Sequence, residues 1–251
     1  MGILIYSMVF TKDRQPQLSD QLIAMKGLDG TNLMTISLGE ITAVVSEIEK
    51  TELVANQANA IRFAEIIDHL DQQFTLLPMR FGSIVDTLDS VSHMLKINYQ
   101  GFIKNLVEVE NKLEFGLKIY CDPEKLKEEL RLESELQSNE LNNTYSNHSV
   151  SVYRDYVNKK LKAHRLEQKL LSYIDAVTAE FSEIVAQWNA ESKIKKKVTA
   201  SKVVDAVFLI DQARKVELIQ SIEGLQAKYP RLSFVLTGPW PPYNFVDVTP
   251  K

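Results

Sequence analysis

The sequence contains a single cysteine, Cys121, and no pattern of cysteines and histidines that could hold a metal ion. One cysteine excludes a disulfide within the chain and is typical of a protein from a reducing compartment. The four histidines are scattered, and none stands at metal-ligand spacing from another or from Cys121. We therefore expect a cytoplasmic protein without a metal centre or another cofactor.

Motifs of common enzyme classes are also missing. The nine glycines do not form the closely spaced loop that cradles a phosphate, and neither a GxSxG turn nor a Walker loop is present. Most acidic residues lie in helical stretches such as 124–135, where pairing four residues apart on a solvated face explains them. Asp211 ends an apolar stretch, and a turn or cap role explains it better than catalysis. The prediction is a protein that is not an enzyme.

Long hydrophobic runs and a strong net charge are absent as well. The apolar start of the chain lacks basic residues and is far shorter than the roughly 20 residues that a membrane helix needs. The net charge of −4 gives no basic surface for nucleic acid, and the lysines of 193–197 have no interleaved aromatics. We expect neither a nucleic acid nor a lipid membrane as partner.

The first part of the chain alternates apolar strand-like stretches with helical periodicity. Residues 3–10 predict a buried strand, and residues 32–48 predict two strands that meet near Gly39-Glu40. Residues 74–86 predict a strand with Pro78 at a sheet edge. Spacings of three and four residues predict two helices. The first, capped by Thr51, buries Val54, Ala58, Ile61, Ala64 and Ile67, and the second, between residues 87 and 110, buries Val91, Leu95, Phe102 and Leu106.

A second unit is expected to begin with a strand over residues 113–122. This strand runs into Asp122-Pro123-Glu124, which has the features of a helix start. Neither glycine nor proline occurs between Glu124 and Glu223, so the polar run 138–149 is the expected break, and a long helix is expected beyond it. Apolar residues in that stretch alternate four and three apart, as in a coiled coil. They are Leu170, Ile174, Val177, Phe181, Ile184 and Trp188.

The end of the chain completes the predicted architecture. Strands over 202–211 and 232–238 enclose a helix over 215–228. The order of elements predicts an α+β fold of two domains with antiparallel sheets and helices. We expect an N-terminal α+β domain over residues 1–112. We expect a C-terminal ferredoxin-like domain over residues 113–251, with a long helical, coiled-coil-like insertion at about 123–192.

Three segments resemble those of a known family. GPWPPYNFV (238–246), in which prolines fix an extended path beside Trp240 and Tyr243, resembles the C-terminal signature of the gas vesicle protein F/L family. LLPMRFGSIVD (76–86) resembles the family's motif of leucine or proline, arginine, phenylalanine and glycine. VVDAVFLID (203–211) resembles the strand before the family's last helix, and Tyr6 in the opening strand matches more loosely. The resemblance does not distinguish the F-type from the L-type branch.

This resemblance implies a non-enzymatic accessory role in gas vesicle formation, at the gas vesicle in the cytoplasm. It implies binding to the small, very apolar major shell subunit, and to other accessory proteins, as a minor structural component or an assembly factor. The physics is compatible with that role, because an exposed sheet edge could pair with a β-rich partner and an aromatic patch could cover apolar surface.

The residues expected to bind a partner or to line a domain interface come from two motifs. They are Arg80, Phe81, Trp240, Pro241 and Tyr243. The residue types favour packing for the phenylalanine and the tryptophan, and an ion pair across the domain junction for the arginine. One alternative is a small-molecule enzyme or ligand-binding protein with a cavity near Arg80. Another is a coiled-coil scaffold for an unrelated complex.

Overall fold

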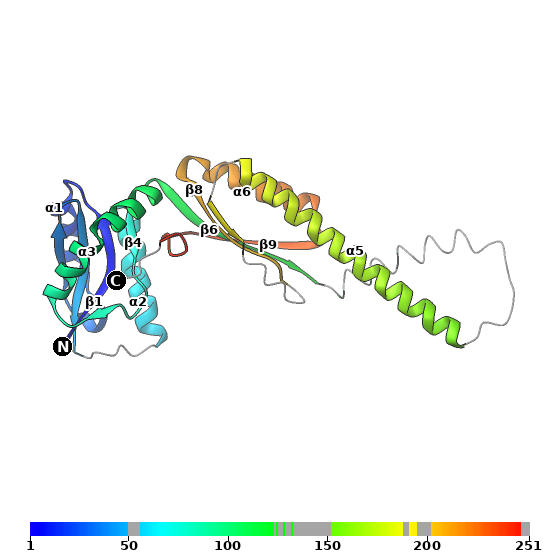
Figure 1. Cartoon of the computed structure of the whole chain (residues 1–251), viewed down its shortest axis with the longest axis horizontal. Coiled ribbons are helices and arrows are strands. Elements are labelled where there is room, and N and C mark those ends of the chain that lie inside the picture. Colours follow the sequence, from blue (N-terminus) through cyan, green and yellow to red (C-terminus); the bar gives the residue numbers. More distant parts are fainter. Residues whose placement is uncertain are drawn as a thin grey trace. The chain divides into compact units, whose positions relative to one another are not determined.

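The computed structural model describes residues 1–49, 56–122, 124, 128, 132, 152–187, 191–194 and 202–246. They form helices and two sheets, so the predicted α+β fold with antiparallel sheets is confirmed (Figure 1). The chain divides into two compact units, each discontinuous in sequence. Unit 1 comprises Met1–Phe115, Leu209–Ala213 and Gly238–Lys251, and unit 2 comprises Gly116–Phe208 and Arg214–Thr237. The sequence alone predicts a continuous division between residues 112 and 113.

The sheet of unit 1 has the strand order β2-β3-β1-β4, and β5 also pairs with β1. Its pairings are antiparallel. The hairpin predicted at Gly39-Glu40 is confirmed, because Leu38 pairs with Ile41 and Gly39 has a φ of 55° at the first turn position. Pro78 ends the edge strand β4, as predicted. The strands are β1 (Gly2–Phe10), β2 (Leu33–Leu38), β3 (Ile41–Ile48), β4 (Leu76–Pro78) and β5 (Ile84–Val85).

Unit 1 also contains the helices α1 (Gln15–Ile23), α2 (Gln57–Asp71) and α3 (Leu88–Val109), and the short 3₁₀ turn η1 (Leu28–Gly30). The side chain of Asn56 accepts a hydrogen bond from Asn59 N (2.8 Å) and caps α2, and Thr87 caps α3 in the same way. The cap predicted at Thr51 lies outside the described residues.

The inward face of α3 is the one that the sequence predicts. Its four predicted core residues are all buried: Val91, Leu95, Phe102 and Leu106. The prediction for α2 is wrong in part, because Ala58 is exposed and Ile61 is 49% exposed, whereas Phe63 is buried. Val54 lies outside the described residues. A neighbouring stripe of larger side chains faces the sheet, and burying larger apolar surface is more favourable. That stripe consists of Phe63, Ile66, Ile67 and Leu70.

One core cluster of unit 1 lies between the central strands and the helices α1 and α2. It joins side chains of β1 and β3 to Leu18 and Leu22 of α1 and to the inward stripe of α2. The helix α3 contacts the same sheet, and its buried residues are not members of this cluster. Because helices cover both faces of the sheet, every residue of its central strand β1 is buried.

Unit 2 has the strand order β7-β8-β6-β9. Its elements follow each other as βαββαβ, the succession of ferredoxin-like folds, and β1 to β4 of unit 1 follow the same succession and strand order. The elements are β6 (Lys112–Cys121), α5 (Val152–Gln187), β7 (Glu191–Ile194), β8 (Lys202–Asp211), η3 (Gln212–Arg214), α6 (Lys215–Lys228) and β9 (Leu232–Trp240).

The long helix α5 packs against β8 and against the end of α6. Phe181, fully buried as its spacing predicts, contacts Phe208 edge-on with ring centroids 6.0 Å apart. Glu180 accepts hydrogen bonds from Lys228 (2.7 Å) and from Tyr229 (2.6 Å). Trp188 lies outside the described residues, and coiled-coil pairing of α5 stays a prediction. No helix in the described parts of the chain is long and apolar enough to cross a membrane.

Candidate functional site

The proline-rich segment of residues 238–246 is a folded part of unit 1. Pro241, Pro242 and Phe245 are buried. A tight turn connects them, in which Tyr243 N donates to Pro241 O (2.7 Å) and Phe245 N donates to Pro242 O (3.3 Å). A free tail would not bury these side chains, so the segment has a defined conformation.

Glu114 of β6 holds this segment. It is 3% exposed, and Asn244 donates to both of its carboxylate oxygens, through the main-chain N (2.8 Å) and through Nδ2 (2.6 Å). A buried carboxylate requires such donors, and charge-assisted hydrogen bonds are the stronger kind. Gly238 allows its segment to lie directly against the main chain of β6. Its φ is 113°, and a Cβ atom there would lie 2.7 Å from Glu114 O.

Two aromatic side chains of the anchored segment remain exposed. Trp240 is 46% exposed and Tyr243 is 41% exposed, on either side of the buried prolines. Trp240 is therefore not a core residue, although its residue type favours packing. The prolines beside it occupy the interior position instead.

Three acidic residues lie close enough to Tyr243 to affect the ionisation of its hydroxyl group. Burial, followed by the negative charges of Asp68, Asp71 and Glu114, raises the pKa of Tyr243. Burial and the charge of Asp68 raise the pKa of Asp71 to about 6, and burial and Glu65 raise the pKa of Asp68. Asp68 and Asp71 belong to the last turn of α2, where the helix dipole also disfavours negative charge.

Asp71→Asn is expected to stabilise the protein at neutral pH. The folded-state pKa of Asp71, about 6, lies above its ordinary value of 3.8, so the charged form costs stability once the pH exceeds that value. The gain should be about 3 kcal/mol well above pH 6 and should disappear as the pH falls toward 4. Urea denaturation across this pH range measures it.

Asp89→Asn provides the matched control for this experiment. Asp89 lies in the first turn of α3, where the helix dipole favours a negative charge. We expect this substitution to lower stability slightly at neutral pH. An Asp71→Asn variant with the same stability as the wild type at pH 7 would contradict the assignment of a buried, repelled carboxylate.

The first motif forms the turn between β4 and β5. Arg80 is exposed, and its main-chain O accepts hydrogen bonds from Ser83 N (3.0 Å) and Oγ (2.8 Å). Gly82 provides the positive φ, 86°, that this turn requires. Within the described parts of the chain, the Arg80 side chain forms no ion pair, so the predicted pair is not observed there. The alternative of a ligand cavity near Arg80 stays a prediction.

Phe81 packs into the core of unit 1, as its residue type favours. It is half-buried, and its ring contacts Phe63 edge-on with centroids 5.4 Å apart. Phe63 in turn stacks on Tyr6 at 5.1 Å. The two motifs therefore have different anchors: the first packs on this aromatic group, and the second is held by Glu114.

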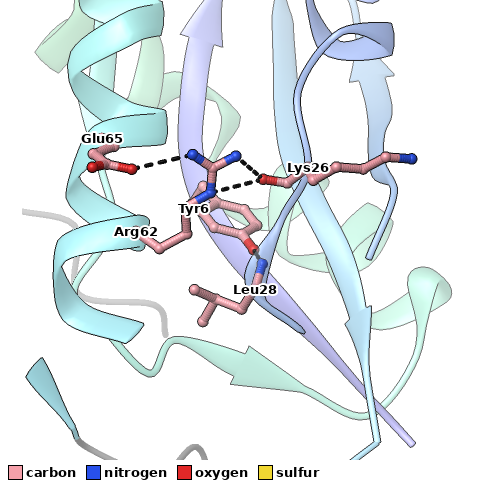
Figure 2. A network of polar contacts seen from close by, with 5 residues as sticks. All are labelled: Tyr6, Lys26, Leu28, Arg62 and Glu65. Carbon is pink, nitrogen blue, oxygen red and sulfur yellow. Dashed lines mark hydrogen bonds and ion pairs between the residues drawn. The ribbon is translucent and has the colours of Figure 1, made fainter. Parts of the chain in front are cut away.

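Tyr6 belongs to a polar network that fixes the loop before β2. Its hydroxyl accepts a hydrogen bond from Leu28 N (3.0 Å) and pairs with Ser46 Oγ (3.0 Å). Arg62 of α2 donates to Lys26 O through Nε (3.2 Å) and Nη2 (2.7 Å), and it forms an ion pair with Glu65 (Figure 2). Burial raises the pKa of Tyr6. The arrangement ties α2, β1 and the loop together, which is a structural role.

The acidic residues near the C-terminal segment are not apparent from the sequence. Glu114, Asp68 and Asp71 lie in ordinary strand and helix patterns, and only the fold places them near the C-terminal segment. Asn244, which lies inside the signature, is the residue of this hydrogen-bonded pair that the sequence singles out. Across the described residues, no group of three histidine, cysteine, aspartate or glutamate side chains could hold a metal ion.

Comparison with known proteins gives two curated relatives. The chain is 37% identical over 46 residues to gas vesicle protein F1 of Halobacterium salinarum, which is 18% of this chain and 22% of that protein. It is 22% identical over 147 residues to gas vesicle protein L of a Streptomyces species, which is 56% of this chain and 50% of that protein. The matches thus span half or less of the length of these relatives.

The fold is also that of two solved structures. The gas vesicle protein GvpF from Anabaena sp. PCC7120 matches with a TM-score of 0.74 at 20% identity, over 99% of this chain and 97% of that one. GvpF from Microcystis aeruginosa matches with a TM-score of 0.72 at 17% identity, over 98% and 99%. At these identities the likeness establishes the fold alone.

The family evidence extends over nearly the whole sequence. The model of the family described as gas vesicle synthesis protein GvpL/GvpF matches residues 2–247, and this range includes both motifs and every described helix and strand. The protein therefore belongs to the gas vesicle synthesis protein GvpL/GvpF family.

Proposed function

We propose that this protein is a non-enzymatic accessory protein of gas vesicle formation that binds the small hydrophobic shell subunit. It acts at the gas vesicle in the cytoplasm, as a minor structural component or as an assembly factor, and other accessory proteins are further candidate partners. Membership of the GvpL/GvpF family supports the accessory role. The observation that carries the proposal is the pair of exposed aromatics, Trp240 and Tyr243, on an anchored segment.

The anchored segment has the properties of a binding surface for an apolar partner. Tryptophan and tyrosine contribute large contact areas and dominate the energetics of many interfaces. The buried prolines and the hydrogen bonds between Glu114 and Asn244 fix the backbone in advance. Binding then costs little additional conformational entropy, which favours affinity.

Trp240→Ala is expected to weaken association with the shell subunit while leaving the fold intact. The side chain is about half exposed, so its loss removes contact surface without opening a cavity in the core. Loss of one central aromatic contact should reduce the shell subunit recovered with the tagged protein by about tenfold or more. The measurement is co-expression followed by a pull-down and by assay of the soluble shell subunit.

Two control variants make this experiment specific. Trp240→Phe keeps an aromatic ring and should retain most of the association. Ile61→Ala removes another large exposed apolar side chain, 49% exposed on α2, and should leave association unchanged. No association of the wild-type protein with the shell subunit would refute the proposed partner. Equal association of the wild-type and Trp240→Ala proteins would refute the proposed surface.

A further inference from the structure

We infer that the free edge of β2 binds an extended strand of the shell subunit by adding it to the sheet of unit 1. This inference rests on the proposed function and names a second part of the binding surface. A sheet edge presents main-chain donors and acceptors, so the occupant that it fits is an extended strand.

The pairing register shows which groups of β2 are free. In the two-residue hairpin, Leu38 and Ile41 form the hydrogen-bonded pair next to the turn, so Thr35 and Ser37 stand in the non-hydrogen-bonded positions opposite Val44 and Thr42. Their N–H and C=O groups consequently point away from β3. Among the described residues, no main-chain hydrogen bond to Thr35 or Ser37 is formed from outside the hairpin.

The opposite edge of the same sheet is closed to strand addition. There β4 has three residues and ends at Pro78, and the turn of the first motif separates it from the two-residue β5. Short strands and proline are the usual means of protecting an edge. β2 has six residues, LMTISL, without proline or charge, and its apolar side chains are half-buried. Among the described strands of this sheet, the β2 side is the one with the features of an accessible edge.

The composition of β2 identifies the chemistry of the partner. An uncharged edge offers no ion pair to a charged strand, which would lose hydration on pairing. A very apolar strand can form the main-chain bonds and also bury its side chains beside Met34 and Ile36, which are half-buried. A second copy of this chain would offer another six-residue edge whose apolar side chains are already half-buried. The shell subunit, as the proposed function describes it, is the better fit.

The substitution Thr35→Pro tests whether the edge of β2 binds a strand of the shell subunit. Proline removes an N–H group that points out of the sheet and places its ring where a new strand would lie, whereas the hydrogen bonds between β2 and β3 are kept. We expect the shell subunit recovered in the co-expression pull-down to fall about tenfold or more. Thr35→Val has the same shape as the wild-type side chain and an intact main chain, so it should bind normally.

The outcomes separate this inference from the proposed function. If the wild-type protein binds no shell subunit, the proposed function fails and the inference fails with it. If the wild-type and Thr35→Pro proteins bind equally and both are folded by circular dichroism, only the inference fails. If Thr35→Pro does not fold, Ser37→Lys, which places a charge on the edge, replaces it and is expected to show the same loss.

Two further measurements identify the partner that binds the edge of β2. Hydrogen exchange should show that the amides of Thr35 and Ser37 become protected when the shell subunit is bound. Light scattering of the protein alone measures self-association. A wild-type dimer that becomes a monomer on Thr35→Pro substitution would show that a second copy occupies the edge, and it would overturn the inference.

Discussion

Phe63→Ala is expected to lower the free energy of unfolding by about 3 to 5 kcal/mol, the usual cost of removing a buried phenylalanine. Phe63 is 3% exposed and contacts Tyr6 and Phe81 through its ring. The substitution opens a cavity between α2 and β1 and removes the ring on which the first motif packs. Urea denaturation followed by circular dichroism measures the loss.

Ile61→Ala is the matched control, on the same helix and two residues away. Its side chain is 49% exposed, so the expected change in the free energy of unfolding is within about 0.5 kcal/mol. The periodicity of the sequence predicts Ile61 as the buried residue instead. A large effect of Ile61→Ala with a small effect of Phe63→Ala would contradict the orientation of α2 described above.

Gly238→Ala is expected to cost about 3 kcal/mol or more, because a strained backbone and a steric clash act together. The φ of Gly238, 113°, is unfavourable for alanine, and the new Cβ would lie 2.7 Å from the main-chain O of Glu114. The segment would lose its position on β6, and the hydrogen bonds between Glu114 and Asn244 would be broken. Association with the shell subunit should decrease together with stability.

Gly101→Ala controls for the general effect of replacing a glycine. Gly101 lies within α3, and nothing lies within 4 Å of a Cβ atom built there. The free energy of unfolding should rise by about 0.5 to 1 kcal/mol, since alanine favours the helix. If Gly238→Ala were as well tolerated as Gly101→Ala, the close approach of residue 238 to Glu114 would be refuted.

The elements that the sequence predicts well are those with a strong local signal. The hairpin at Gly39-Glu40 has a glycine where the turn requires a positive φ, and the inward face of α3 has a regular stripe of large apolar residues. The sequence predicts the buried face of α2 less well, because this helix contains two apolar stripes. Packing against β1 and α1 selects the stripe with Phe63.

The residues of the candidate site also differ in whether the sequence predicts them. The signature of residues 238–246 and the turn containing Arg80 and Phe81 are contiguous motifs and can be recognised in the sequence. The anchor Glu114 lies 130 residues from Asn244, and no local pattern connects them. The acids of α2 beside Tyr243 are also brought near by the fold alone.

The α+β class, the order of most strands and helices, and the family resemblance can be predicted from the amino-acid sequence, because they follow from the spacing of apolar residues, from glycine and proline, and from contiguous motifs. Contacts between distant parts of the chain are needed to bury Phe63 and expose Trp240, to bring Glu114 to the C-terminal segment, and to leave β2 at an edge of the described sheet. The physical reason is that burial, hydrogen bonding and strand neighbours depend on residues far apart in the chain, which a local pattern does not specify.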